Sequence, residues 1–560
     1  MYVADFETTT NKDDCRVWAW GLCEIGQPDN FIYGTDIDSF FRRIKELAKK
    51  SETVYFHNLR FDGSFLLWYL FKNGYSHIED KKEKADATFT TLISDKGEFY
   101  SIEVYFKVMK KRSHKIKFLD SLKVLPLSVA EIARGFNLPV QKLELDYTAD
   151  REPGHELTAD EARYLRNDCE IVARALDILF KQKLTKMTTA ANAIADYKEI
   201  VTLKRFEHWF PVPDYDADVR QSYRGGFTFV KPDIAGKMIG DGIVLDVNSL
   251  FPSVMYSRPL PYGDPIFFRG KYKPDPLYKL YVQAFTCNFE LKPGHIPTIQ
   301  VKHNRAFVPT EYLTSSQGED VPLCLTSVDL ELFFEHYNVY NVEWISGWKF
   351  KSSVIMFRDY IDKWYAIKQR ATAENNKPLR TIAKLQLNSL YGKFGTAPRC
   401  RSKIPFFDWH SDIVRYRYGE WEERNPIYIP VATFITAWAR YITISAAQSV
   451  YDRFLYADTD SLHLAGTNIP AEIDVDALRL GAWKHESTFT RAKYIRAKSY
   501  IEEIDGKICV TCAGLPAGVH DQVTFENFTE EAVYTGKLRP VTVRGGTVLE
   551  ETNFTIRKGK

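Results

Sequence analysis

The sequence has few of the features that mark exported, membrane-spanning or zinc-finger proteins. Its 560 residues include only eight cysteines, and these are scattered, with one CxxC pair at Cys509 and Cys512. No second CxxC or CxxH lies at zinc-finger spacing, so the pair does not predict a metal site. No apolar run approaches about 18 residues, and the first residues lack the basic and apolar segments of an export signal. We therefore expect a chain with reduced thiols that is neither exported nor inserted in a membrane.

An excess of charge of one sign is also lacking. Lys and Arg number 75, and Asp and Glu 73, which leaves a formal net charge of +2. Net charge averages over sites, and acidic centres offset a basic groove elsewhere, so this balance neither supports nor excludes nucleic acid as a ligand. The G-x-x-x-x-G-K-[ST] phosphate loop is missing, which argues against an ATP-driven motor. Repeats and low-complexity linkers are missing too, so we expect several subdomains packed against one another.

The first third of the chain mixes strand-like and helical segments. Strand-like runs occur at 2–4 and 53–56, and a long helix is expected at 157–181. Thr158 can cap this helix, because Glu161 stands three residues later at the capping-box position. This alternation predicts an α/β domain.

The remainder predicts a second region of α+β type. A buried strand is expected at 243–247, followed by a long mixed segment with short strands. Helices at 356–373 and 379–394, joined by the connector 374–378, predict an antiparallel helical hairpin. Strand-like segments on both sides of Asp458 predict a β-hairpin that turns through the aspartates.

Four acidic residues of the first third form one candidate site. Asp5 and Glu7 stand two residues apart on a strand, so both side chains point to one face. Asp168 follows Tyr164 by four residues on a helix and shares its face, and Asp62 follows the strand-like run at 53–56. Four converging carboxylates repel one another unless hard divalent cations such as Mg²⁺ or Mn²⁺ neutralise them. Two such ions can activate water and stabilise a leaving 3′ oxygen during phosphodiester hydrolysis.

A second acidic set lies in the remainder of the chain. Asp246 ends the strand at 243–247, and Asp458 and Asp460 stand two residues apart in the later hairpin. A nucleotidyl transferase needs carboxylates from two strands to hold two metal ions at the reacting 3′-hydroxyl and the leaving pyrophosphate. These residues therefore predict a second metal-dependent site, for nucleotide transfer.

The second helix of the hairpin can supply groups for a nucleotide. Lys384, Asn388 and Tyr391 share one face of it, and an apolar face lies opposite. A cation, an amide and a ring can contact the phosphate, sugar and base of one nucleotide. Periodicity alone does not distinguish this arrangement from an ordinary amphipathic helix with a hydrated face.

In order and spacing, the motifs resemble two known sets. Three of them resemble the exonuclease motifs of DEDDy-type proofreading domains: Asp-x-Glu at 5–7, Asn-x-x-x-Asp at 58–62 and Tyr-x-x-x-Asp at 164–168. Three more resemble motifs A, B and C of family B DNA polymerases: D-x-x-S-L-F-P at 246–252, K-x-x-x-N-S-x-Y-G at 384–392 and Y-x-D-T-D-S at 456–461.

Further segments at 223–227, 436–440 and 498–500 resemble motifs of the protein-primed branch of that family, and especially the phi29-type replicative polymerases of small tailed Bacillus phages. The resemblance runs along nearly the whole chain. It implies a DNA-directed DNA polymerase that replicates viral DNA by processive, strand-displacing synthesis and carries a 3′–5′ proofreading exonuclease. The implied partners are template-primer DNA, single-stranded 3′ ends, dNTPs and a terminal protein as primer. It further implies a monomer, without a membrane partner, in the cytoplasm of an infected bacterial host.

The resemblance also implies a division of the chain, with an RNase H-like exonuclease domain joined to a right-hand polymerase domain. The expected parts are the exonuclease (1–188), the palm (189–257 and 429–520), an insertion that contacts the terminal protein (258–356), the fingers (357–395), a second insertion (396–428) and the thumb (521–560).

Residue roles follow from the same resemblance. Tyr164 is expected to orient the attacking water, and Lys142 to stabilise the scissile phosphate. The residues expected to hold a frayed 3′ strand are Thr8, Tyr55, His57, Asn58, Phe61, Phe65, Ser121 and Leu122. Two ions are expected at each site, held by Asp5, Glu7, Asp62 and Asp168 in one and by Asp246, Val247 and Asp458 in the other. Asp460 is expected to support the second site.

Ligands of the polymerisation site are implied in the same way. The residues expected to contact the nucleotide are Val247, Phe251, Lys368, Lys384, Asn388 and Tyr391. Those expected to contact template or primer are Tyr223, Arg224, Gly225, Gly226, Thr436, Arg440, Lys498 and Tyr500.

The sequence departs from the family pattern at Phe251, where motif A usually has Tyr. A phenyl ring can still exclude a ribose 2′-hydroxyl, so we expect Phe251 to act as a steric gate without the hydrogen bond of a tyrosine. A standalone 3′–5′ exonuclease with a non-catalytic DNA-binding region is the main alternative, but it leaves motifs A, B and C without a role. A reverse transcriptase usually has adjacent aspartates, whereas Thr459 separates Asp458 from Asp460 here.

Overall fold

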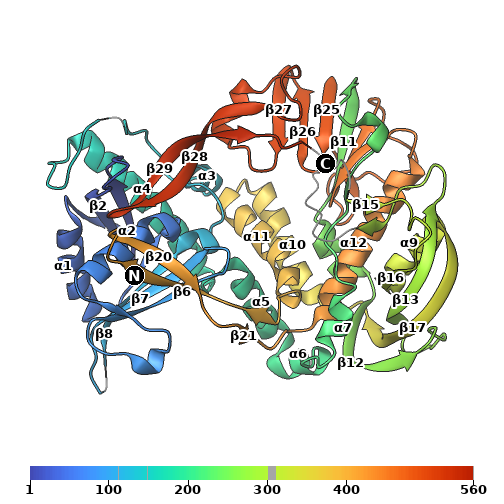
Figure 1. Cartoon of the computed structure of the whole chain (residues 1–560), viewed down its shortest axis with the longest axis horizontal. Coiled ribbons are helices and arrows are strands. Elements are labelled where there is room, and N and C mark those ends of the chain that lie inside the picture. The colour runs from blue at the N-terminus through green and yellow to red at the C-terminus, as the bar shows by residue number, and fades with distance from the viewer. Residues whose placement is uncertain (111, 148, 301–310, 559–560) are drawn as a thin grey trace.

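The computed structural model describes residues 1–110, 112–147, 149–300 and 311–558. Figure 1 shows one β-rich part formed by the N-terminal segment and another formed mainly by the second half of the chain. The helices α5 (Thr189–Val201), α10 (Arg358–Ala373) and α11 (Lys377–Phe394) lie between them. None of the helices in the described part of the chain has the length and apolar character needed to cross a membrane.

The N-terminal part is a mixed eight-stranded sheet with the order β3-β2-β1-β4-β8-β7-β6-β5. β1 pairs in parallel with β4, and β4 with β8, as expected for an α/β domain. The strands are β1 (Tyr2–Thr8), β2 (Val17–Glu24), β3 (Gln27–Gly34), β4 (Thr53–Phe56), β5 (Ser76–His77), β6 (Thr88–Ile93), β7 (Phe99–Lys107) and β8 (His114–Asp120). The accompanying helices are α1 (Ile37–Ala48), α2 (Leu59–Lys72), α3 (Val129–Gly135) and α4 (Ala159–Lys181).

Helix α4 begins as its sequence predicts. The side chain of Thr158 accepts a hydrogen bond from the backbone N–H of Glu161, and the carboxylate of Glu161 accepts one from the backbone N–H of Thr158 at 2.9 Å. This confirms the expected capping box. The helix packs on β1 and β2 and buries Leu165, Cys169 and Leu176. It therefore carries Tyr164 and Asp168 to the strand that bears Asp5 and Glu7.

The second sheet has the order β24-β11-β23-β22-β9. Its strands are β9 (Thr228–Val230), β11 (Gly242–Val247), β22 (Phe454–Asp458), β23 (Ser461–Ala465) and β24 (Trp483–Phe489). β22 and β23 pair antiparallel around Asp458, which confirms the expected hairpin through the aspartates. Helices α8 (Leu250–Ser257) and α12 (Ile429–Ser449) pack together beside this sheet. A four-stranded sheet contacts β24 through β26; its order is β10 (Met238–Ile239), β25 (Arg491–Arg496), β26 (Ser499–Ile504) and β27 (Lys507–Cys512).

The helical hairpin α10–α11 forms as expected, but its connector is shorter than predicted. Pro378 lies in the first turn of α11, not in the connector. Proline is tolerated there because the first helical N–H groups have no partner within the helix. Asn376 caps the helix by accepting a hydrogen bond from the backbone N–H of Leu379 at 3.2 Å. The expected connector 374–378 was therefore too long at its C-terminal end.

Along the sequence, the segment between β11 and α10 forms a further four-stranded sheet, of order β12-β17-β13-β16. Helix α9 (Ser327–His336) packs against this sheet. Its strands are β12 (Leu260–Arg269), β13 (Leu280–Leu291), β16 (Val321–Thr326) and β17 (Tyr337–Ser353). After α11, two small antiparallel pairs follow, formed by β18 (Arg399–Cys400), β19 (Lys403–Asp408), β20 (Ile413–Tyr418) and β21 (Glu422–Glu423).

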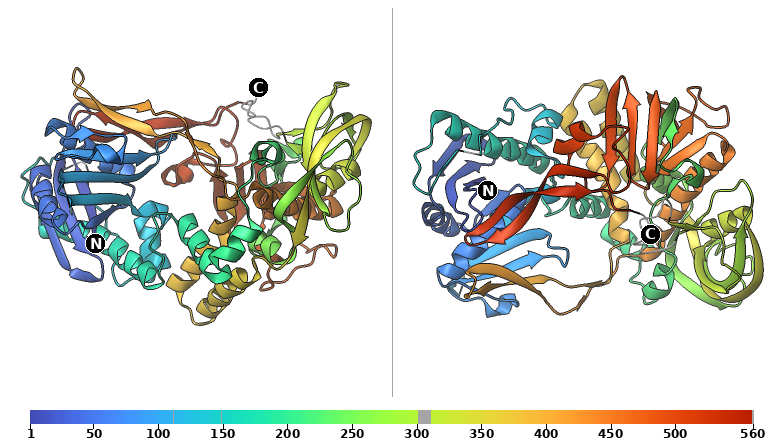
Figure 2. Two further views of the ribbon diagram at one scale, coloured as in Figure 1. Left: turned by 90° about the horizontal axis from the view of Figure 1, so that it is seen from below. Right: turned by 45° about the horizontal axis from the view of Figure 1, so that its top comes forward.

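Two hairpins that are distant in sequence meet beside the N-terminal sheet. One is β19–β20, and the other is the C-terminal pair β28 (Val533–Val543) and β29 (Gly546–Thr555), which crosses to the N-terminal part in Figures 1 and 2. Asp412, at the turn of the first, pairs with Arg544 of the second at 2.8 Å and with Lys72 of α2 at 2.8 Å. Asp412 therefore links the two hairpins to each other and to α2, and we call this linked segment the bridge at Asp412.

Candidate active sites

The four acids of the first set come together around one cavity. Asp5 and Glu7 project from β1, Asp62 lies in the first turn of α2, and Asp168 lies on α4. All four line a cavity of about 590 Å³, which Tyr164 and Lys142 also line. This convergence is the tertiary arrangement that a shared site requires.

The electrostatics of this cavity favour an additional cation. Burial, and then the charge of Asp168, raises the pKa of Asp5 to about 7. Burial, and then repulsion from Asp5, raises the pKa values of Glu7 and Asp62 above their usual range. The ammonium of Lys142 binds Asp168 and supplies part of the missing positive charge.

Two oxygen atoms of the cavity also lack partners. One Oδ1 atom each of Asp62 and Asp168 is buried with no hydrogen-bond partner. Within the described residues, no group of three or more His, Cys, Asp or Glu side chains is arranged to hold a metal ion as it stands. Buried, unpartnered carboxylate oxygens beside mutually repelling acids nevertheless suit hard divalent cations, so this donor set fits the metal that the sequence predicts.

The hydroxyl of Tyr164 has two hydrogen-bond partners, and one of them, Tyr147, was not predicted from the sequence. Its hydroxyl lies 2.8 Å from the hydroxyl of Tyr147 and 3.2 Å from Nζ of Lys142. Burial, followed by the charge of Asp168, raises the pKa of Tyr164 well above its usual value, so the phenol remains protonated. Tyr147 stands between α3 and α4, outside any periodic segment, so periodicity gave no signal for it.

The C-terminal hairpin supplies another part of the cavity that the sequence did not predict. Leu538, Thr547, Val548 and Leu549 line it together with the carboxylates. Because they are distant in sequence and lie in no recognised motif, only the fold brings them to this site.

The residues expected to hold a single strand fall into two groups. Thr8, His57, Asn58 and Phe61 line the cavity. Three others are buried: Tyr55, Phe65 and Ser121 have exposed fractions of 6%, 1% and 0%. Leu122 is half-buried beside Ser121.

The buried group supports the cavity from behind. The hydroxyl of Ser121 donates to the carbonyl of Phe56 at 3.0 Å and lies 2.9 Å from Nδ1 of His57. Phe65 packs against Gly546 of β29, where an added Cβ would lie 2.4 Å from its ring. In this conformation Ser121 and Phe65 support residues that line the cavity. All three buried side chains, including Tyr55, present no surface to a DNA strand.

The second acidic set forms part of a row across the second sheet, whose order is β24-β11-β23-β22-β9. Asp246 of β11 lies opposite Ser461 of β23, and Asp458 of β22 lies opposite the same serine. The row continues to Lys484 on β24 and Thr228 on β9. Residues in register across a sheet project from the same face, and two strand spacings separate Asp246 from Asp458 by about 10 Å. The sheet therefore presents both carboxylates on one surface.

Local contacts orient each aspartate of this row. Nζ of Lys498 lies 2.7 and 2.6 Å from the two carboxylate oxygens of Asp458, and Thr228 donates to one of them at 3.1 Å. Nζ of Lys484 lies 3.3 Å from Asp246. Burial raises the pKa of Asp246 despite the nearby lysine.

Asp460 occupies the turn behind these two residues. Its carbonyl accepts a hydrogen bond from the backbone N–H of Val247 at 2.8 Å, and its own N–H donates to the carbonyl of Asp458 at 2.7 Å. Burial, and then the charge of Asp246, raises the pKa of Asp460 to about 6. These contacts suit the supporting role expected of it. The side chain of Val247 is buried, which leaves only its backbone for a ligand.

Cations gather beside the row. Lys368 of α10 donates to the hydroxyl of Ser249 at 3.0 Å. Burial lowers the pKa of Lys368, and so does repulsion from three other cations, which are Lys384, Arg380 and Lys484. Sequence reasoning missed Arg380, which stands four residues before Lys384 on the same face of α11, and Lys484, which lies on a strand without a recognised motif. A bound polyanion would relieve the repulsion among these cations. Metal ions held by the two nearby carboxylates could bind the same polyanion.

The exposed face of α11 is the one that the sequence predicts. Lys384 and Asn388 are exposed, whereas Ile382, Leu387 and Leu390 are buried. Tyr391 stacks on Phe251 of α8, with ring centroids 4.2 Å apart and 23° between the ring planes. This contact fixes the ring of Phe251 against the exposed face of α11.

The loop at 223–226 is held by a buried guanidinium. Arg440 of α12 is 2% exposed and donates to the carbonyls of Arg224 and Gly225 at 2.9 and 2.7 Å. It also forms two hydrogen bonds with Asp329 of α9, at 2.9 and 2.8 Å. Thr436, equally buried, donates within its own helix. Arg440 and Thr436 therefore act from behind this loop and do not present a surface to DNA.

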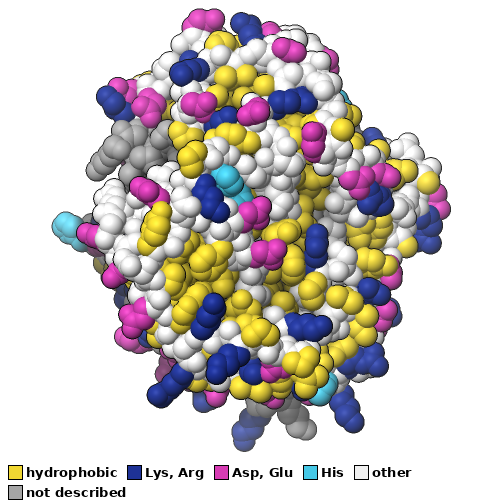
Figure 3. Space-filling view, turned by 90° about the vertical axis from the view of Figure 1, so that its right-hand side faces the viewer, with side chains coloured by type: hydrophobic (Ala, Val, Ile, Leu, Met, Phe, Trp, Pro, Cys, Tyr) yellow, Lys and Arg dark blue, Asp and Glu magenta, His cyan; other side chains and the backbone are white. Residues whose placement is uncertain are grey.

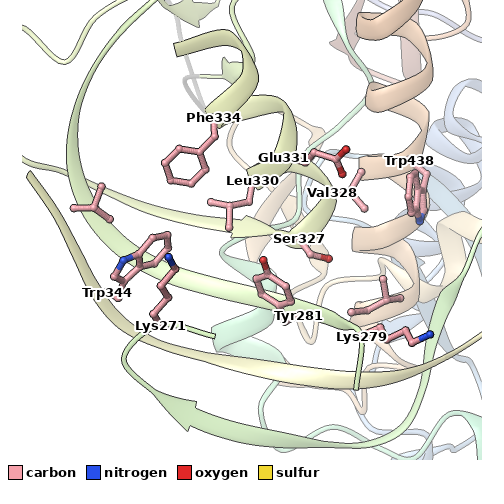
Figure 4. Close-up of a pocket in the computed structure, with 12 residues that line it drawn as sticks. Lys271, Lys279, Tyr281, Ser327, Val328, Leu330, Glu331, Phe334, Trp344 and Trp438 are labelled. Carbon is pink, nitrogen blue, oxygen red and sulfur yellow. The ribbon is translucent and has the colours of Figure 1, made fainter. Parts of the chain in front are cut away.

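A separate hollow of about 810 Å³ lies among α9, β13, β17 and α12. Figure 4 shows Tyr281, Phe334, Trp344 and Trp438 around it, with Glu331 nearby. Figure 3 looks onto the side of the molecule that carries the sheet β12-β17-β13-β16, where hydrophobic and charged side chains are interspersed. None of the carboxylates of either acidic set lines this hollow, so we assign no chemistry to it.

Known proteins share this sequence and arrangement. The chain matches the family described as DNA polymerase type B, organellar and viral, over residues 44–153 and 147–477. The DNA polymerases of Bacillus phages Nf and phi29 are 46% and 45% identical to it, over 100% of this chain and 99% of each relative. The DNA polymerase of Streptococcus phage Cp-1 is 33% identical, over 100% of this chain and 98% of its own.

Solved structures agree. Phi29 DNA polymerase complexed with primer-template DNA, and the same enzyme with primer-template DNA and incoming nucleotide substrates, both superpose with a TM-score of 0.93 at 44% identity. They cover 100% and 99% of this chain and all of their own chains. Members of this family generally use divalent metal ions. The chain therefore belongs to the organellar and viral type B DNA polymerases, of the protein-primed phi29 type, and is a replicative DNA-directed DNA polymerase with 3′–5′ exonuclease activity.

Proposed function

We propose that the chain runs its two activities at the two carboxylate sites described above, with two Mg²⁺ or Mn²⁺ ions at each. The observation that carries this proposal is the in-register row in which Asp246 and Asp458 flank Ser461 on one face of a sheet. The separate cavity around Asp5, Glu7 and Asp168 supports a second, independent site.

At the polymerisation site, the primer 3′-hydroxyl attacks the α-phosphate of a dNTP in line with the leaving pyrophosphate. Asp246 and Asp458 hold the ions, which when bound lower the pKa of the hydroxyl and neutralise charge on the pyrophosphate. Lys368 and Lys384 bind the triphosphate. Phe251, fixed by its stack on Tyr391, excludes a ribose 2′-hydroxyl.

Other residues of this site orient the strands. Lys498 and Tyr500 bind the primer terminus, and the loop at 223–226 contacts the template. Arg440 contributes by holding the carbonyls of that loop in place. The priming hydroxyl can also belong to a terminal protein.

At the exonuclease site, Asp5, Glu7, Asp62 and Asp168 hold the ions. Tyr164, kept protonated by burial, orients the attacking water through its hydroxyl. Lys142, which lies beside Asp168 and Tyr164, would stabilise the scissile phosphate. Thr8, His57, Asn58 and Phe61 grip the frayed 3′ strand along the cavity wall.

We also propose the division of the chain into exonuclease (1–188), palm (189–257 and 429–520), two insertions (258–356 and 396–428), fingers (357–395) and thumb (521–560). The first insertion contacts the terminal protein. The chain works as a monomer in the cytoplasm of an infected bacterium, on primer-template DNA like the bound phi29 enzyme.

Asp458→Asn should abolish dNTP incorporation and leave degradation of single-stranded DNA intact. The double change Asp5→Ala with Glu7→Ala should have the opposite effect. Primer extension and single-strand degradation, measured on the same preparations, test this directly. If either variant loses both activities while remaining folded by circular dichroism, two independent sites cannot be maintained.

Processive, strand-displacing synthesis follows if the bridge at Asp412 encloses DNA. Enclosure makes dissociation less sensitive to salt than electrostatic binding alone. Primer extension with excess trap DNA should give long products at moderate salt. Products of only a few nucleotides would count against enclosure.

A further inference from the structure

Lys484 belongs to the polymerisation site, although it lies in none of the motifs that mark this site. It stands on β24 directly opposite Asp246, at one end of the row that also contains Asp458. Its side chain is 30% exposed, so it lies at the boundary of the site and solvent. This position places an ammonium on the same face of the sheet as the catalytic carboxylates.

The ammonium of Lys484 is shared between two acids. Nζ lies 3.3 Å from Asp246 and 2.5 Å from Glu486, which stands two residues along the same strand. Glu486 therefore holds the ammonium within reach of Asp246. Lys498 makes the corresponding contact with Asp458.

We infer that Lys484 competes with a divalent ion for the carboxylate of Asp246 and thereby sets the metal requirement of polymerisation. This inference rests on the proposed role of Asp246 as a metal ligand. A cation that approaches Asp246 must displace the ammonium, which then remains paired with Glu486. Binding of the ion is weakened by the free energy of the Lys484–Asp246 contact. For a partly exposed pair, that contact corresponds to about a two- to fivefold change in affinity.

Three variants of the row separate this role from others. Lys484→Gln removes the competing charge, so metal binding should become about two- to fivefold tighter. Lys484→Arg retains the charge and should remain close to the unsubstituted chain. Glu486→Gln frees the ammonium to pair with Asp246 alone, so metal binding should become weaker. Opposite signs from two neighbouring positions are not expected from a general loss of structure.

Direct metal binding is the main readout. Mn²⁺ is titrated into each variant and free Mn²⁺ is measured by electron paramagnetic resonance, in a background with Asp5→Ala and Glu7→Ala so that the exonuclease site does not contribute. The Mg²⁺ concentration for half-maximal dNTP incorporation is then measured and should fall for Lys484→Gln by the same factor. The half-saturating dNTP concentration is measured in the same assay.

The outcomes distinguish this inference from the proposed function. Unchanged Mn²⁺ affinity in Lys484→Gln, or weaker dNTP binding without a change in metal requirement, overturns the competing role. Asp246→Asn in the same background is the reference, because it should weaken Mn²⁺ binding strongly. If Asp246→Asn leaves Mn²⁺ binding unaltered, the proposed metal site itself fails, whatever Lys484 does.

Discussion

Gly226 tests how the loop at 223–226 and the turn at 458–460 fit together. A Cβ added at Gly226 would lie 2.7 Å from Oγ1 and 2.9 Å from Cγ2 of Thr459. Thr459 separates Asp458 from Asp460 and cannot move freely. Its N–H donates to the carbonyl of Phe227 at 2.6 Å, and its carbonyl accepts from Thr443 at 2.7 Å. Gly226→Ala must therefore displace either the turn at 458–460 or the loop at 223–226.

The expected size of this effect follows from two estimates. Overpacking of this kind costs about 1–3 kcal/mol. A shift of about 1 Å at a reacting group can cost about 100-fold in rate. We expect kcat/KM for dNTP incorporation to fall about 10- to 100-fold in Gly226→Ala, with degradation of single strands unaffected. Steady-state single-nucleotide insertion on a fixed primer-template measures the first rate, and release of labelled mononucleotides measures the second.

A control at Gly225 and a compensating change at Thr459 test the steric explanation. An added Cβ at the neighbouring Gly225 meets nothing within 4 Å, so Gly225→Ala should lose far less activity. Thr459→Ala removes both clashing atoms, at the cost of its 3.2 Å hydrogen bond to Asp458. The double variant Gly226→Ala with Thr459→Ala should recover most of the lost incorporation, relative to Thr459→Ala alone. Equal effects at the two glycines, or no recovery in the double variant, would refute the steric explanation.

Three further predictions concern single side chains. The pKa of Asp5 is raised to about 7, so the protonated carboxyl contributes stability that is full below about pH 4 and is lost as the pH rises through 7. Melting temperatures measured in EDTA should fall over this pH range. Mg²⁺ should offset the fall, and Asp5→Asn should remove the pH dependence. Phe251→Ala should lower discrimination against ribonucleotides about 10- to 200-fold, measured as the ratio of kcat/KM for dNTP and rNTP, and an unchanged ratio would exclude a steric gate. Tyr147→Phe removes the hydroxyl 2.8 Å from that of Tyr164 and should slow strand degradation about fivefold without slowing incorporation; an equal loss of both activities would contradict this role.

Much of the architecture near the chemistry could be predicted from local sequence. Period-2 placement of Asp5 and Glu7, the capping box at Thr158 and the hairpin around Asp458 depend on neighbouring residues, and all are present. The exposed face of α11 follows from its 3.6-residue period in the same way. Local signals misjudged the connector before α11, because proline is compatible with both a turn and a first helical turn.

The sequence by itself thus determined which side chains each site contains, namely carboxylates, lysines and tyrosines. The spacing of such residues along one helix or strand is a local property. Tertiary structure decided which distant groups share a cavity. It brought Leu549 of the C-terminal hairpin to the cavity that the first acidic set lines, and it placed Lys484 opposite Asp246. It also buried Arg440 behind the loop at 223–226, where the sequence suggested contact with DNA. The reason is physical: cross-strand register and burial depend on how whole sheets and helices pack, and no spacing within one segment encodes them.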